Sequence, residues 1–111
     1  MKENDRSRSP GDRLLAVMAA LANPHRLRII AALSRDGRTY VSQLARDIGI
    51  SRPLLHLHLQ KLEDAGLVTS RLELSDDGKA LNYFEVTDFN LQLTAEAVAR
   101  VADSVTANSE K

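Results

Sequence analysis

Side chains that can bind nucleotide bases and phosphates gather in one ten-residue stretch of the chain. Arg52, His56 and Gln60 follow one another at intervals of four residues, so on a helix they lie on one side. A guanidinium can form paired hydrogen bonds with a guanine edge, and imidazole and amide groups can bond base edges or phosphates. The candidate contact residues on this stretch are Ser51, Arg52, Pro53, His56, Leu57 and Gln60.

Catalytic chemistry is poorly represented in the same 111 residues. There is no cysteine, and hence no thiolate nucleophile, thiolate metal site or disulfide, which fits a reducing compartment. We find no glycine-rich phosphate loop and no paired histidine-glutamate metal motif, and the five glycines lack a strand-loop-helix context. We therefore expect a binding protein and not an enzyme.

The first part of the chain predicts a flexible arm and two helices. Residues 1–11 are polar and end in Pro-Gly, which is typical of an arm. Asp12 is expected to cap a helix over 13–22, and Asn23 with Pro24 to start a second helix that ends near Arg35. The second helix is expected to turn these side chains inward: Leu27, Ile30, Ala31 and Leu33.

Two further helices are predicted to be joined by a tight turn. Residues 39–41 are expected to be extended before a short third helix, which ends near Ile48 with Gly49 as its stop. Ser51 can cap a fourth helix that runs to Ala65. Its buried stripe is expected at spacings of four and three residues: Leu55, Leu59 and Leu62.

After Gly66 the apolar pattern changes from helical to strand-like spacing. Residues 67–74 and 80–86 predict a β-hairpin whose turn is 75–79. A last helix is expected over about 90–107, with one apolar side: Leu91, Ala95, Val98, Val101, Ala102 and Val105.

These elements together predict a winged helix-turn-helix fold, mainly α with a small β-hairpin and dimeric. In this fold the second helix of the turn enters the major groove of DNA. The hairpin is a wing that contacts the DNA backbone or the minor groove, and Arg71 and Lys79 are the cations placed to make these contacts. We expect one domain over 12–107 and a flexible C-terminus over 108–111.

Three segments carry a resemblance to a known family. They are residues 22–30 (ANPHRLRII), Leu44-Ala45, and residues 50–68 (ISRPLLHLHLQKLEDAGLV), and they resemble the ArsR/SmtB-type winged-helix transcriptional regulators. The resemblance implies a homodimer built from the first and last helices, which binds operator DNA, usually as a repressor and often under the control of an inducer. The residues expected at the dimer interface are Leu14, Met18, Leu91, Val98, Val101 and Val105.

The metal sites that many of these relatives have are not kept. Tyr40 and Ser42 stand where metal-binding relatives have cysteines; Asp88 remains, but Asn90, Val101 and Ser104 replace other ligands. His56 and His58 are two apart on a helix, a poor chelating geometry, and His58 is expected to be a structural histidine. A site that combines a histidine with carboxylates such as Glu96 or Asp103 across the dimer is less probable than solvated charge. We therefore expect no cofactor, and metal sensing is doubtful.

Charge and composition leave three readings of the function open. The net charge is zero, but residues 25–82 hold nine Lys/Arg and seven Asp/Glu, and residues 83–111 hold two Lys/Arg and five Asp/Glu. This difference in charge weakly favours a DNA-binding face opposite a dimer face. We expect a cytoplasmic protein without a membrane span. The alternatives to a repressor are an activator and a protein-interaction module with weak DNA binding. Leu54 and Leu57 either contact thymine methyl groups or pack inside.

Overall fold

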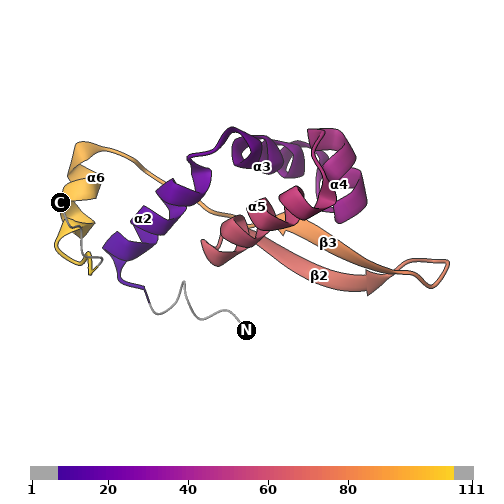
Figure 1. The fold of residues 1–111 in the computed structure, drawn as a ribbon. Helices are drawn as coiled ribbons and strands as arrows, with labels where there is room; N and C mark the ends of the chain where they lie inside the picture. Colours follow the sequence, from indigo (N-terminus) through magenta and orange to yellow (C-terminus); the bar gives the residue numbers. More distant parts are fainter. Residues whose placement is uncertain (1–7, 107–111) are drawn as a thin grey trace.

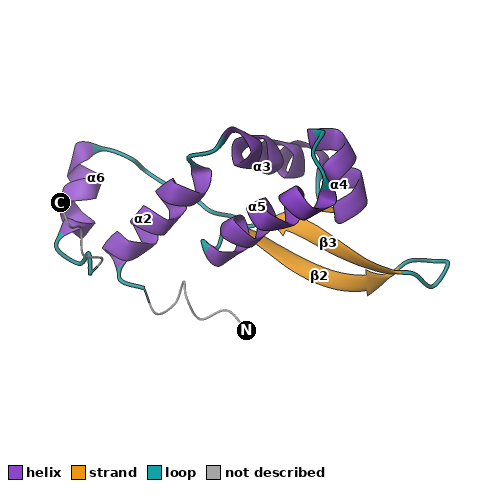
Figure 2. Cartoon of the chain, in the orientation of Figure 1, coloured by secondary structure: helices purple, strands orange, loops and turns teal. Residues whose placement is uncertain are grey.

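The computed structural model describes residues 8–106, which form a small sheet with helices packed against it, and the tip of the hairpin projects beyond these helices (Figure 1, Figure 2). The elements follow the order α2 (Pro10–Leu21), α3 (Pro24–Asp36), β1 (Thr39–Tyr40), α4 (Val41–Ile48), α5 (Arg52–Asp64), β2 (Val68–Leu74), β3 (Ala80–Val86) and α6 (Ala95–Ala102). This order confirms the winged helix-turn-helix prediction, with one short strand added. The predicted C-terminal end, 108–111, and most of the predicted arm lie outside the described residues.

The core lies where α3, α4 and α5 meet the sheet. Apolar side chains from each of these elements are almost fully buried: Ile29, Leu33, Leu44, Leu55, Leu59, Leu62, Leu67 and Val68. The molecule is elongated, 52 × 27 × 26 Å, with α2 and α6 at one end and the tip of the hairpin at the other (Figure 1). One core thus holds α3, α4, α5 and the sheet together, and α2 and α6 extend away from it.

The sheet is antiparallel with strand order β1-β3-β2. Phe84 on β3 pairs with Thr39 on one side and with Ser70 on the other, and it is 4% exposed. The hairpin turn closes through the Ser75 N–H, which donates to the Lys79 carbonyl at 2.7 Å, and Gly78 supplies a φ of 86°. Glycine adopts a positive φ without strain, whereas few other residues do. The predicted turn is therefore confirmed, and so is the expected role of its glycine.

The first helix begins earlier than the sequence predicts. Ser9, and not Asp12, is the N-cap: its hydroxyl accepts from the Asp12 N–H at 3.1 Å, and Pro10 occupies the first helical position. Proline is well tolerated there because its missing N–H would have no partner in the helix. The predicted start at residue 13 is therefore wrong, and Pro10 and Gly11 belong to α2 and not to an arm.

The inward side of α3 also differs from the prediction. Ile29, Ala32 and Leu33 are buried, whereas Leu27 is 54% exposed and Ala31 is exposed. The core covers fewer positions on α3 than there are apolar residues on this helix. The helical spacing alone therefore predicts a buried face that is rotated by about one residue from the buried face in the structure. The predicted bounds of this helix, by contrast, are confirmed by its Asn23 cap and by Gly37 at its end.

The last helix is much shorter than predicted. It spans eight residues instead of the expected 90–107, so Leu91 and Val105 lie outside it. At the start of α6, the Thr94 hydroxyl accepts a hydrogen bond from the Ala97 N–H at 3.0 Å. Just after its end, the Ser104 hydroxyl donates to the Val101 carbonyl at 2.7 Å. Hydroxyl side chains that bond the local backbone in this way compete with further helical hydrogen bonds.

Candidate nucleic-acid interface

The turn between α4 and α5 presents the start of α5 to solvent. Gly49 adopts the left-handed conformation (φ 82°, ψ 33°) and its N–H donates to the Ala45 carbonyl at 2.8 Å, which ends α4. Two residues later the Ser51 hydroxyl accepts from the Leu54 N–H at 3.3 Å and starts α5. The prediction of a helix-turn-helix with these two residues at its corner is confirmed, and α5 takes the place of the recognition helix.

The recognition helix has a buried side and an exposed side. Leu55, Leu59 and Leu62 are at most 1% exposed, as predicted. Leu54 is 38% exposed and Leu57 66% exposed, so neither leucine packs inside. The other predicted contact residues on this helix are all exposed: Ser51, Arg52, Pro53, His56 and Gln60.

The exposed polar side chains differ in whether they are already bonded. Gln60 donates through its amide nitrogen to Asp64 Oδ1 at 2.9 Å, so a base contact by Gln60 requires this bond to break. Within residues 8–106, Arg52 and His56 make no hydrogen bond or ion pair through their side chains. Of the predicted contact residues on α5, these two side chains are therefore the polar groups most readily available to a ligand.

His58 joins the recognition helix to the helices behind it. It is 7% exposed, and its Nδ1 accepts a hydrogen bond from Arg26 Nε at 3.1 Å. The same guanidinium donates to the carbonyls of Ala19 and Ala20 at 3.3 and 3.1 Å, so Arg26 connects α2, α3 and α5. The prediction of a structural His58 is confirmed. Sequence reasoning missed Arg26 because its partners are distant along the chain.

Burial lowers the pKa of His58, and the positive charge of Arg26 and the neighbouring His25 lower it further. The His25 ring lies 5.4 Å from that of His58, centroid to centroid, and its Nδ1 is buried. A protonated His58 would lose its acceptor at Nδ1 and face the Arg26 cation. The geometry therefore favours the neutral imidazole.

The hairpin carries its two predicted cations at different places. Ser70 faces α5, where its hydroxyl donates to Glu63 Oε2 at 3.0 Å; strand alternation therefore turns Arg71 to the opposite face of the sheet. Lys79 lies in the turn at the tip. The structure thus brings together the predicted residues of α5 but does not bring Arg71 to the same surface.

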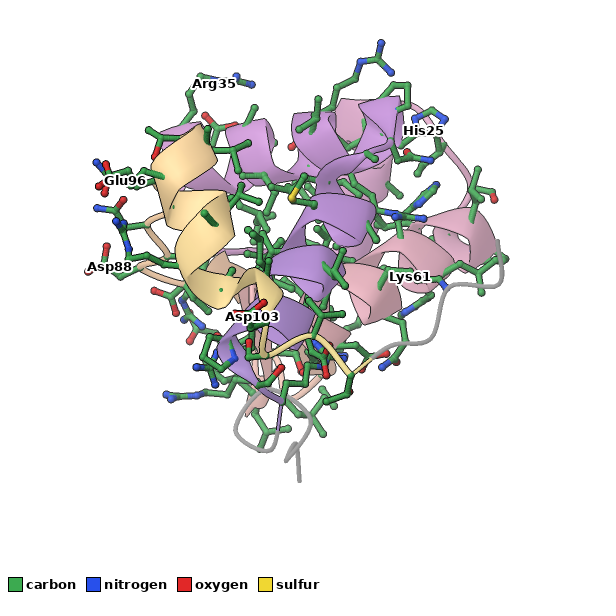
Figure 3. All side chains as sticks on the ribbon, turned by 90° about the vertical axis from the view of Figure 1, so that its left-hand side faces the viewer. His25, Arg35, Lys61, Asp88, Glu96 and Asp103 are labelled. Atoms are coloured by element: carbon green, nitrogen blue, oxygen red, sulfur yellow. The ribbon has the colours of Figure 1, made fainter. Side chains whose placement is uncertain are left out.

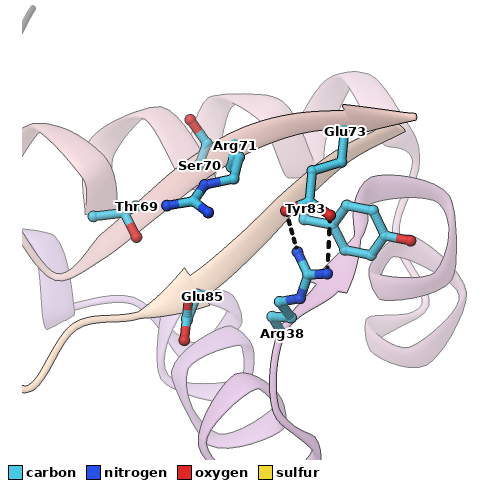
Figure 4. A pocket seen from close by; sticks show the side chains of 7 residues that line it. All are labelled: Arg38, Thr69, Ser70, Arg71, Glu73, Tyr83 and Glu85. Atoms are coloured by element: carbon cyan, nitrogen blue, oxygen red, sulfur yellow. Dashed lines mark hydrogen bonds and ion pairs between the residues drawn. The ribbon is translucent and has the colours of Figure 1, made fainter. Parts of the chain in front are cut away.

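Arg71 instead shares a hollow with an unpredicted ion pair (Figure 4). Arg38 forms two hydrogen bonds of 2.9 Å with Glu73, and its guanidinium lies 4.3 Å from the centroid of the Tyr83 ring. The Arg38 guanidinium holds the pKa of Glu73 below its usual value. This clamp, Arg38–Glu73, ties the segment before β1 to the end of β2.

At the opposite end of the molecule, α2 and α6 expose an apolar surface. Leu14 and Val101 are half-buried and line a hollow of about 360 Å³ together with Val17 and Leu91. The remaining predicted interface residues are exposed, Met18 by 41%, Val98 by 40% and Val105 by 37%. The predicted dimer residues therefore lie at one end of the molecule, although Leu91 reaches it from the segment before α6.

The residues discussed as metal ligands are not gathered. Asp88, Glu96 and Asp103 are spread along α6 and the segment before it, and His25 lies on the other side of α2 (Figure 3). Tyr40 packs edge-on against Tyr83, with ring centroids 5.8 Å apart. Among residues 8–106, no group of three or more His, Asp or Glu side chains is placed to hold a metal ion.

No single helix within the described range is long and apolar enough to cross a membrane. The helices α2 and α3 pass that test of length and composition only as a pair, and they are bent by 95° relative to each other.

Comparison with known proteins identifies the family. A model of a helix-turn-helix domain matches residues 21–71. An uncharacterized HTH-type transcriptional regulator of Methanocaldococcus jannaschii is 32% identical over 85 residues, which are 77% of this chain and 87% of that protein. The solution structure of a homodimeric winged helix-turn-helix DNA-binding domain from Mycobacterium bovis, a possible ArsR-family regulator, is 30% identical with a TM-score of 0.60. It covers 80% of this chain and 70% of that one.

The chain belongs to the ArsR/SmtB family of winged helix-turn-helix transcriptional regulators. A probable mercury resistance operon repressor of Streptomyces lividans is 39% identical over 64 residues, but this ArsR/SmtB chain spans only 47% of that protein. Residues 21–71, which the helix-turn-helix model matches, include α4, the turn and α5, so the α4-turn-α5 unit described above is the helix-turn-helix of this family.

Proposed function

We propose that this ArsR/SmtB regulator represses transcription as a homodimer that binds an inverted-repeat operator. The observation that carries the proposal is the exposed side of α5, where Arg52 and His56 are free to bind and the helix start faces solvent. An N-terminal arginine on such a helix is suited to a guanine edge or a phosphate in the major groove. The S. lividans relative, which is named a repressor, supports the sign of control.

The dimer is supported by the apolar end of the molecule. Of the described elements, α2 is the principal neighbour of α6, and the two helices leave Met18 and Val98 exposed beside an apolar hollow. Exposed apolar surface of this kind marks an interface, and the M. bovis relative is homodimeric. Two-fold symmetry then places two α5 helices roughly 34 Å apart, one turn of DNA, and requires an operator with matching symmetry.

The regulatory input is proposed to differ from that of metal-sensing relatives, and no catalysis is proposed. Tyr40 and Ser42 have no thiolate to offer, and Tyr40 is occupied against Tyr83. Control would then come from another effector, a partner protein or the amount of the regulator itself, in the cytoplasm, where its DNA lies. An enzymatic turnover measured on purified protein would contradict this part of the proposal.

The test is a fluorescence anisotropy titration with DNA from upstream of the protein's own gene. Random duplex is the competitor, and the titration is repeated over several salt concentrations and with Zn²⁺, Cd²⁺ or Hg²⁺ present or absent. We expect competitor-resistant binding that weakens as salt rises and does not respond to the metals. A metal-dependent affinity would overturn the proposed input, whereas binding no tighter than to random DNA, also after selection from a random library, would favour a protein-interaction module.

A further inference from the structure

The least expected residue on the recognition surface is a leucine. Leu57 is 66% exposed, and its neighbours on the same side of α5, Pro53 one turn before and Gln60 one turn after, are exposed as well. It therefore occupies the middle of the side of α5 that faces away from the core. Leu54, three residues earlier and 38% exposed, adds a second apolar side chain at the edge of this surface.

The polar groups around Leu57 do not provide base recognition at the centre of the helix. Gln60 is bonded to Asp64 at 2.9 Å, and Pro53 has no side-chain donor. Arg52 and His56, which are free to bind, lie nearer the start of the helix. The centre of the surface thus offers methyl groups, with hydrogen-bonding side chains around it, among them exposed Lys61 one turn later.

We propose that Leu57, supported by Leu54, recognises thymine through its C5-methyl group in the major groove. The methyl group of thymine is the apolar feature that a base pair presents there, and contact with Leu57 removes apolar surface of both groups from water. The inference rests on the proposed function, because it requires α5 to enter the major groove. It adds that each half-site contains a thymine whose methyl group contributes to affinity.

A DNA occupant fits this surface better than a protein occupant because of the charges beside the leucines. Arg52 lies on the same exposed helix start, and within residues 8–106 its charge has no partner. Burial of an unpaired guanidinium under an apolar protein surface is costly, whereas DNA supplies phosphates and acceptor edges next to its methyl groups.

The experiment uses the full chain and duplexes selected with it from a random double-stranded library. In the tightest duplex, each thymine is replaced in turn, in both half-sites, by deoxyuridine, which pairs identically but lacks the methyl group. For the unchanged protein we expect one position at which the replacement weakens binding about fourfold per half-site, the effect of one methyl-sized apolar contact. In Leu57→Ala the same replacement should have little further effect.

Two controls make the result decisive. Leu27→Ala removes a leucine of similar exposure, 54%, from α3, and should keep the full preference for thymine. Circular dichroism melts should show that Leu57→Ala folds, since its side chain is largely outside the core. Equal affinity for thymine and deoxyuridine at every position, or an unchanged thymine preference in Leu57→Ala, overturns the inference while specific binding stands. A library that yields no enriched duplex overturns the proposed function and the inference with it.

Discussion

At the scale of single residues, the recognition helix separates side chains by their availability. Arg52 is exposed and free, while His58, six residues later on the same helix, is 7% exposed and bonded to Arg26. Arg52 is therefore available to a ligand, whereas His58 on the same helix contributes to the packing of the protein.

Arg52→Ala is expected to weaken binding to the selected duplex more than binding to random DNA. A bidentate contact to a guanine contributes about 1–3 kcal/mol of discrimination, or roughly 5- to 150-fold. Competition titrations of the two duplexes measure the ratio. An equal loss on both duplexes would show that Arg52 contacts phosphate only. Lys79→Ala, at the tip of the hairpin, is the control for such a phosphate contact. It should weaken binding to both duplexes equally and reduce the salt dependence of binding.

The second residue-scale prediction concerns pH. The pKa of His58 is lowered in the folded protein, so below about pH 6.5, the ordinary histidine value, the unfolded chain takes up a proton that the folded chain does not. The free energy of unfolding should therefore decrease as pH falls from there to the folded pKa, with a slope of at most about 1.4 kcal/mol per pH unit.

Urea denaturation across this pH range tests the assignment to His58. His58→Asn keeps an acceptor near Arg26 without a titrating ring, so its stability should vary less with pH; His56→Asn, on the exposed side, should leave the slope unchanged. If His58→Asn retains the original slope, another group is responsible.

At the scale of elements, the contact between α2 and α6 depends on a residue without a side chain. The Gly11 N–H donates to the Ser104 hydroxyl at 2.7 Å, and a Cβ at Gly11 would lie 2.5 Å from the Val101 carbonyl oxygen and 2.6 Å from Val105 Cγ2. The start of α2 can approach the end of α6 this closely only because residue 11 is glycine.

Gly11→Ala should therefore displace α6 from α2 and lower the free energy of unfolding by about 1–3 kcal/mol, the usual cost of overpacking. Ser104→Ala separates the causes, because it removes the two hydrogen bonds of the Ser104 hydroxyl, to the Gly11 N–H and the Val101 carbonyl, without adding an atom. Each bond contributes about 1 kcal/mol. Denaturant unfolding compares the two variants. A Gly11→Ala protein as stable as the original would show that the two elements can move apart without loss.

The clamp between Arg38 and Glu73 yields a prediction about the hairpin. Glu73→Gln should increase amide hydrogen exchange in β2 and β3 while changing global stability little, because both side chains are accessible to solvent. Hydrogen exchange detected by mass spectrometry measures this effect, and Glu85→Gln on the same sheet face is the control. Identical exchange in the two variants would mean that the clamp does not order the wing.

The elements with strong local signals are those that the sequence predicts well. Asn23-Pro24, Gly49 with Ser51, and Gly78 each determine a boundary through backbone geometry, and the structure confirms all of them. Local signals do not determine contacts between distant segments. The sequence predicts a long last helix because apolar residues continue past Ser104. In the structure the chain turns back to α2 at this point, and the Thr106 N–H donates to Asp12 at 2.9 Å.

The candidate site was predictable to a similar extent. Exposure of the α5 residues follows from its helical period, whereas Arg26 and Arg38 act through partners 32 and 35 residues away. The direction of Arg71 depends on the register of β2 against β3 and on the Ser70–Glu63 contact. None of these is a property of a short window of sequence.

At the scale of the whole molecule, the proposed dimer end and the recognition helix lie in different parts of an elongated molecule. In Figure 1, α5 lies between the α2–α6 end and the tip of the hairpin. Val98→Glu should place a charge in the proposed interface, convert the protein to a monomer in sedimentation velocity and weaken operator binding by more than tenfold. Leu27→Glu, at an apolar position on α3 that is 54% exposed against 40% for Val98, should leave the dimer intact. A dimeric Val98→Glu protein would contradict the proposed interface.

A dimer interface that includes the short α6, as proposed, would make the regulator sensitive to its own abundance. Helices below about 12–15 residues are marginal by themselves, and α6 has eight, so its order depends on what it packs against. With the proposed interface, the protomers separate at low copy number, α6 loses its packing in the dimer, and the two α5 helices no longer bind DNA as a pair. As synthesis raises the copy number, dimers accumulate with the square of the monomer concentration, so that a gradual change in expression produces a steeper change in operator occupancy without any small-molecule signal.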